Sequence, residues 1–166
     1  MKAKSFAAAF ILCLTTATRL HSIGLGLQLN FGAGDIFIPG VALVVSPHDK
    51  TNIAVNWRIA DEVNTFGFTV DYCPLTLPIT DFKQASLNFT VGVGLFTNLD
   101  YDKSGGRDHG IEGGVRAPVG LNLMLFENVF EIYFHVAPSF GLQFKPKLDL
   151  TNLFFPAALG GRFWLR

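Results

Sequence analysis

The stretch Ile23 to Gly32, IGLGLQLNFG, alternates between two kinds of residue. Every second position is apolar, namely Ile23, Leu25, Leu27, Leu29 and Phe31, and the positions between them hold Gly24, Gly26, Gln28 and Asn30. A period of two predicts a β-strand whose two faces differ. The class of protein depends on which of the two faces meets water.

The composition indicates that the bulky face is not covered by an ordinary soluble core. Of the 166 residues, enough for one domain, 49% are hydrophobic and only 16% are charged, against about 25% charged in typical soluble domains. Thirteen Lys and Arg balance thirteen Asp and Glu, so no basic excess favours nucleic acid as a partner.

The first 22 residues have the layout of a secretory signal peptide. Lys2 and Lys4 precede an apolar run from Phe6 to Leu14, which is shorter than the roughly 20 residues of a membrane-spanning helix. We therefore expect residues 1–22 to direct export and residues 23–166 to form the mature domain. Cys73 is then the sole cysteine of the mature chain, so no intramolecular disulfide is expected.

Alternation recurs along the rest of the chain. We predict eight strands, at residues 23–31, 36–45, 52–60, 66–73, 85–95, 111–125, 130–143 and 154–166, separated by turn-forming clusters that include LTLPITD at residues 75–81. An even number of antiparallel strands with short links predicts an all-β fold, an eight-stranded up-and-down transmembrane β-barrel.

The distribution of charge decides which face is outward. The regularly alternating strands carry no Lys, Arg, Asp or Glu in their apolar rows, whereas the opposite rows hold glycine, small polar residues and a few charges. This pattern predicts bulky residues toward lipid and a narrow polar lumen. We expect an ion-pair network to fill that lumen, formed by Arg58, Asp71, Glu112, Arg116, Glu131, His135 and Arg162.

The C-terminal stretch GGRFWLR carries the most specific likeness to a known family. In it Gly160 is followed by Phe163 and Leu165, three and five positions later. With the eight strands, this pattern resembles the small outer-membrane barrels of the OmpA membrane domain and OmpX type, including the short barrels of spirochaetes. The resemblance implies a location in the outer membrane of a Gram-negative or spirochaete envelope, outer-membrane lipid as a partner, and insertion by the outer-membrane assembly machinery through Gly160, Phe163 and Leu165.

Enzymatic chemistry is not expected. Glu131, His135 and Ser139 share one strand face, but four strand residues span roughly 13 Å, which is too far for a hydrogen-bonded triad. The loop DYDKSGGRD at residues 100–108 resembles a calcium loop but has Ile111 where the bidentate glutamate belongs. We therefore expect no cofactor and no metal.

Aromatic residues near the predicted strand ends are candidates for interfacial girdles: Trp57, Tyr72, Phe130, Phe163 and Trp164. The largest predicted outward loop follows Asn98, and its candidate contacts with a host or ligand are Asp100, Tyr101, Asp102, Lys103 and Arg107. The leading functional hypothesis is a structural outer-membrane protein that displays loops. The alternatives are a small-pore barrel and a soluble, lipocalin-like periplasmic carrier of an apolar ligand.

Overall fold

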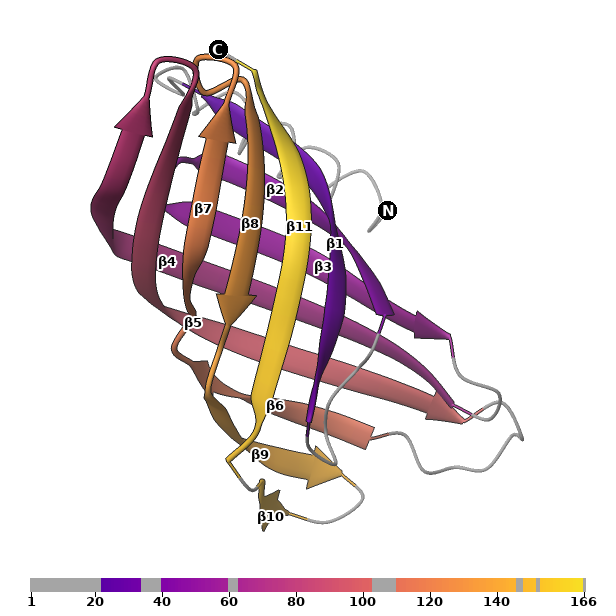
Figure 1. Cartoon of the computed structure of the whole chain (residues 1–166). Helices are drawn as coiled ribbons and strands as arrows, with labels where there is room; N and C mark the ends of the chain where they lie inside the picture. Colours follow the sequence, from indigo (N-terminus) through magenta and orange to yellow (C-terminus); the bar gives the residue numbers. More distant parts are fainter. Residues whose placement is uncertain are drawn as a thin grey trace, which may run out of the picture.

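The computed structural model describes residues 22–33, 40–59, 63–102, 110–145, 148–151 and 153–165 as a closed antiparallel β-barrel (Figure 1). The predicted signal peptide, including Cys13, lies outside the described residues. No helix in the described ranges is long and apolar enough to cross a membrane.

Eight segments form the wall: β1 to β5, β6 together with β7, β8 together with β9, and β11, while the short β10 pairs with β9 at one end. The strands are β1 (Ile23–Ala33), β2 (Gly40–His48), β3 (Thr51–Ile59), β4 (Val63–Phe82), β5 (Ala85–Asp102), β6 (Gly110–Arg116), β7 (Val119–Leu125), β8 (Phe130–Val136), β9 (Ser139–Lys145), β10 (Asp149–Leu150) and β11 (Phe155–Leu165). β6 and β7 are the two halves of one predicted strand, interrupted at Ala117 and Pro118, and β8 and β9 are the halves of the next. The predicted eight-stranded meander is confirmed.

The barrel closes where the first strand pairs with the last. β1 and β11 pair antiparallel over their whole lengths, from Ile23 opposite Leu165 to Ala33 opposite Phe155. β11 also pairs with β8, β8 with β7, and β7 with β5, which completes the ring. Every described strand except the two-residue β10, which pairs only with β9, therefore has a partner on each side over part of its length.

The strand registers give the tilt of the wall. The shear of the barrel is found by stepping from Leu27 to the residue opposite it on each next strand. Around the ring through β2, β3 and β4, these steps reach Thr97 of β5. In the other direction, through β11, β8 and β7, they reach Leu87 of β5. The two end points on β5, Leu87 and Thr97, differ by ten residues, which is the shear of the barrel. For eight strands such a shear corresponds to a tilt of about 35–45° from the barrel axis.

The two ends of the barrel differ. Tight turns at Asp49–Lys50, Lys83–Gln84 and Phe126–Val129 lie at the same end as the finish of β11. Figure 1 shows β10 and the start of β11 at the opposite end, together with the strand ends that flank the longer connections.

β4 is longer than predicted. The stretch at residues 75–81, expected to be a connection, is the second half of this strand and pairs with β5 from Leu75 to Phe82. Beyond Tyr72, β4 has no partner other than β5 among the described strands. Pro74 and Pro78 fit such an edge, where a missing N–H breaks no second ladder. The prediction of a turn here is wrong, because proline is compatible with an edge strand as well as with a turn.

The face assignment in the opening stretch is confirmed. Leu25, Leu27, Leu29 and Phe31 are exposed on the outside, Leu27 at 69%, and Gly24 is buried inside. Inward positions of the described strands hold mostly polar, small or glycine residues. The usual arrangement of a soluble barrel is thus inverted, with an apolar exterior and a polar interior.

Glycine at position 160 makes room for an aromatic ring. It pairs with Tyr133 across β11 and β8, and a Cβ at position 160 would overlap the Tyr133 ring. We expect Gly160→Ala to destabilise the folded barrel by about 1–3 kcal/mol, the usual cost of overpacking. Gly113→Ala is the control, because its nearest contact would be 3.4 Å away. Urea unfolding in detergent measures both, and equal stabilities would contradict this packing.

Candidate functional site in the barrel interior

A buried ion pair lies across β8 and β11. Nε of Arg162 donates to Oε2 of Glu131 at 2.6 Å, and Nη2 donates to Oε1 at 2.7 Å. Both side chains are 2% exposed. Residues 131 and 162 are direct partners in the strand register, so the sheet itself presents the two groups to each other in a bidentate geometry.

Uncharged side chains complete the shell of this pair. Glu131 also accepts hydrogen bonds from Nε1 of Trp164, at 2.7 Å, and from Nδ2 of Asn122. Nη1 of Arg162 donates to Oγ of Ser46 at 2.6 Å and to Oδ1 of Asn52. A buried charge pair stabilises a fold only when such further hydrogen bonds replace the lost water.

Two aromatic rings enclose the guanidinium. Cζ of Arg162 lies 5.0 Å from the ring centroid of Tyr133 and 4.8 Å from that of Trp164. Both distances are within the range of cation–π attraction. The cation is therefore held by the carboxylate in one direction and by the two rings in others, which leaves it little freedom to move.

A series of polar contacts extends from this centre. His135 Nε2 lies 2.9 Å from Oδ1 of Asn122, which also accepts from Thr90 at 3.0 Å. The Tyr133 hydroxyl donates to Gln28 at 2.9 Å. Gln28 in turn donates to Asn30 at 2.5 Å, and Asn30 donates to Asn56 at 2.7 Å. These contacts link β8, β7 and β5 with β1 and β3 across the lumen.

A second ion pair lies apart from the first. Nε of Arg116 is 3.1 Å from Oδ1 of Asp71, and both side chains are nearly buried. The contact is electrostatic only, because neither of these two atoms has a hydrogen-bond partner among the described residues. This pair is less completely satisfied than Arg162 and Glu131.

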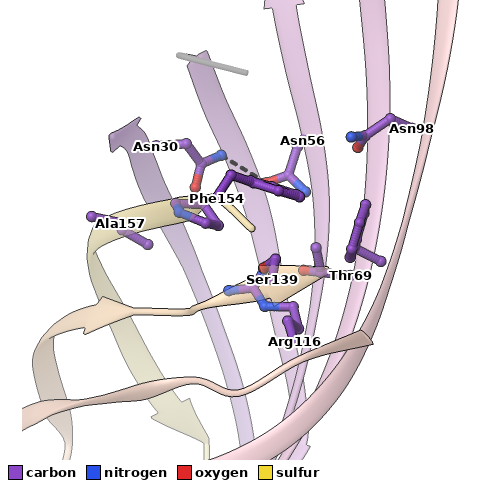
Figure 2. Close-up of a pocket in the computed structure, with 11 residues that line it drawn as sticks. Asn30, Asn56, Thr69, Asn98, Arg116, Ser139, Phe154 and Ala157 are labelled. Atoms are coloured by element: carbon purple, nitrogen blue, oxygen red, sulfur yellow. Dashed lines mark hydrogen bonds between the residues drawn. The ribbon is translucent and has the colours of Figure 1, made fainter. Parts of the chain in front are cut away.

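A cavity of about 50 Å³ adjoins the second pair (Figure 2). Asparagines from three strands, a serine, Arg116 and two phenylalanines contribute to its lining, which comprises Asn30, Asn56, Thr69, Phe96, Asn98, Arg116, Ser139, Phe154, Pro156, Ala157 and Ala158. In Figure 2 the asparagines reach into this space, and Asn30 bonds to Asn56. The space suits a few water molecules.

The predicted lumen residues thus fall into separate groups. Arg162, Glu131 and His135 share one set of contacts through Asn122, and Arg116 contacts Asp71. Glu112 is buried farther along, opposite Asn98 and Gln143 in the register. Arg58 is opposite Thr65 in the backbone pairing, and its side chain lies outside the described set.

The candidate loop contacts are only partly described. Asp100 and Tyr101 belong to β5 rather than to a loop. Asp100 accepts a hydrogen bond from Thr65 at 2.5 Å, and the Tyr101 ring meets Phe66 edge-on at 6.5 Å. Asp102 is the last residue of β5. Lys103 and Arg107 lie outside the described residues.

The C-terminal signature is distributed over both faces. Phe163 and Leu165 are exposed on the outside, whereas Gly160 faces inward beneath Tyr133. Trp57, Tyr72 and Phe163 are also outward, and Phe130 is half-buried. The girdle assignment for Trp164 is wrong, because its ring is buried in the lumen at 5% exposure. Trp164 shares its row with Arg162, so strand alternation alone places it inside.

The side chains of Ser139 and His135 contact different partners. Ser139 donates its hydroxyl proton to the carbonyl of Ala137 at 2.7 Å, while His135 contacts Asn122. In the part of the chain that the structure describes, no group of three or more His, Cys, Asp or Glu could hold a metal ion. Cys73 is buried and free.

The chain is similar to known proteins in structure. No protein-family model and no curated protein matches the chain. Among solved structures, the chain is similar to the N-terminal β-barrel domain of Pseudomonas aeruginosa OprF, at 14% sequence identity and a TM-score of 0.39, over 87% of this chain and 97% of that chain. The strand pairings of the chain itself define the closed barrel.

A double-mutant cycle measures the coupling between Arg162 and Glu131. We expect Glu131→Gln to lower the free energy of unfolding by about 3–5 kcal/mol, because it leaves Arg162 buried without its anion. Combining Glu131→Gln with Arg162→Met removes both charges and should cost less than the sum of the single changes. Urea titration in detergent measures this, with exposed Lys83→Ala as the control. Additive costs would show that the two groups act independently.

Proposed function

We propose that the chain is an integral outer-membrane β-barrel protein that has a structural role in the envelope and displays loops at one end. The observation that carries this proposal is the outward face, where large apolar side chains are exposed on every long strand. Examples are Leu27, Leu43, Val55, Phe68, Val93, Phe134 and Phe163. Exposed to water, so large an apolar surface would be costly, at roughly 25 cal/mol for each Å².

The exposed charges support the same placement. On the described strands and turns they lie near the ends of the barrel, as with Asp49, Asp81, Lys83, Glu127 and Asp149. Between the ends, the outward rows are mostly apolar. β1 and β11 have 11 residues each, which matches the roughly 9–11 residues that a tilted strand needs to cross a bilayer.

Display is proposed for the end of the barrel opposite the tight turns. The longest of the connections that leave this end joins Asp102 to Gly110 and includes Lys103 and Arg107. We propose these residues as contacts for a host or ligand molecule, export through the signal peptide at residues 1–22, and insertion by the outer-membrane assembly machinery through the C-terminal signature.

Fractionation and electrophoresis test the membrane assignment. We expect the native protein in the outer-membrane fraction, with unboiled and boiled samples migrating differently on SDS gels, because a closed barrel resists SDS until it is heated. A soluble periplasmic protein without a heat shift would contradict the proposal. That result would favour the lipocalin-like carrier, although the interior of the described barrel is polar rather than apolar.

Conductance separates a structural barrel from a small pore. We expect no stable channels in planar bilayers, because Arg162, Glu131 and the two rings beside them occupy the lumen. The double variant Glu131→Ala with Arg162→Ala removes the two charged side chains and leaves the rings, and conductance that appears only in this variant would show that the charged pair blocks the lumen. Steady conductance by the unaltered protein would contradict the structural role and support the pore.

A further inference from the structure

The last part of β4, residues 74–82 and here called the β4 extension, is exposed on both faces over most of its length. In the first part of the strand every second residue from Thr65 to Asp71 is buried. From Pro74 to Ile79, by contrast, every residue is exposed. Figure 1 shows this end of β4 at the margin of the sheet, close to the tight turns. The lumen therefore does not continue behind the β4 extension.

The β4 extension also has a free backbone edge. On one side it pairs with β5 as far as Phe82. On the other side β2 and β3 end at the turn Asp49–Lys50, where the N–H of Cys73 donates to the carbonyl of Lys50 at 2.7 Å. Beyond that bond, no described strand pairs with this side of β4. Hydrocarbon offers no partner to unpaired backbone groups, so in a membrane protein such an edge belongs in water.

Two prolines reduce what this edge offers to another strand. Thr76 and Pro78 lie opposite Thr90 and Asn88 of β5, in an unbroken stretch of the register. Backbone groups two residues apart point the same way, and a proline within a sheet has its nitrogen on the unpaired side. The backbone of Thr76 therefore also points to the free edge. Because Pro74 and Pro78 have no N–H, only Thr76 supplies a donor there.

Without such protection, the edge would be a template for pairing with another chain. An unpaired strand with exposed apolar side chains is the usual starting point for aggregation. The register shifts after Tyr72 and again after Pro78, and natural sheets blunt exposed edges with prolines and with irregularities of this kind. Large apolar side chains are exposed along the β4 extension, namely Leu75, Leu77, Ile79 and Phe82.

We propose that the β4 extension stands in water beyond the bilayer, where Pro74 and Pro78 prevent it from pairing with an extended chain. This proposal rests on the proposed membrane location, which requires a free edge to lie outside the hydrocarbon. Strand addition depends on backbone bonds rather than on one sequence. The chains that the prolines exclude are therefore extended polypeptides in general, including unfolded copies of this protein.

Labelling of cysteine variants in lipid nanodiscs tests the location. Cys13→Ser and Cys73→Ser remove the native thiols, and either Leu77→Cys or Val55→Cys adds one. Leu77 and Val55 are matched in exposure, at 48% and 49%. A membrane-impermeant maleimide is expected to modify position 77 and not position 55. If neither position is modified, the β4 extension lies in hydrocarbon and the inference is overturned. Modification of both positions would contradict the membrane location on which the inference rests.

Strand addition has its own test. The probe is a fluorescent synthetic peptide of residues 51–59, the strand that pairs with this side of β4 up to Tyr72. Fluorescence anisotropy measures its binding to the barrel refolded in detergent. We expect Pro74→Thr with Pro78→Thr to bind the peptide about tenfold or more tightly than the unaltered barrel, because two backbone donors are restored. Adding Thr76→Pro is the matched control and should abolish this gain, since it removes a donor from the free edge alone.

The outcomes separate the prolines from other surfaces. Equal affinities of the unaltered barrel and the double variant would overturn the role of Pro74 and Pro78. A gain that survives Thr76→Pro would overturn the free edge as the place of binding. Each sample is first checked for the heat shift, which reports whether the barrel is folded. If the double variant does not fold, Pro78→Thr alone replaces it, with a gain in affinity again expected and equal affinity again overturning the proposal.

Discussion

Closure of the strand ladder is the constraint on which the rest of the structure depends. A bilayer offers no water to unpaired backbone groups, so a sheet that crosses it must leave no free edge. The full-length pairing of β1 with β11 closes the ring, and among the described strands β4 beyond Tyr72 keeps one edge without a partner strand. Once the ring is closed with eight strands, the interior is only wide enough for side chains. The nature of those side chains then decides whether the barrel is filled, hollow or conducting.

The interior is filled by charges that the fold itself neutralises. Burying one ion costs several kcal/mol even after relaxation, and an incompletely hydrogen-bonded pair does not recover that cost. Arg162 and Glu131 avoid the penalty because register places them opposite each other and because Trp164, Asn122 and Ser46 supply the remaining hydrogen bonds. Gly160 contributes by its lack of a side chain, since the Tyr133 ring beside the guanidinium occupies that space. A polar lumen and a rigid lumen are thus consequences of the same contacts.

Strand alternation predicts much of this fold, because a period of two is a local property of the chain. It gave the eight strands, their outward and inward rows, and the inward placement of Glu131, His135 and Arg162. Pairing inside the lumen depends instead on register and shear, which bring Ser46 of β2 to Arg162 of β11. No local pattern encodes such a contact. Strand alternation places Asn122 and Trp164 in the inward rows, but it does not predict that these uncharged side chains bond to Glu131. The extension of β4 was missed because a proline at a sheet edge and a proline in a turn look alike in sequence.

The bend of the wall follows from prolines at neighbouring positions of successive strands. The carbonyl of Pro118 accepts from N–H of Gly92, that of Pro138 from Ala117, and that of Pro156 from Ala137, each at 2.8 or 2.9 Å. Proline removes a donor but keeps its acceptor, so each interruption still holds the adjacent strand through one bond. The ring remains closed while its two halves change direction, as the separation of β6 from β7 and of β8 from β9 shows in Figure 1. The inner cavity lies beside this line, and so does a hollow in the outward face that Val93, Val115 and Phe140 help to line. The interruption of regular pairing is therefore what opens space on both sides of an otherwise filled barrel.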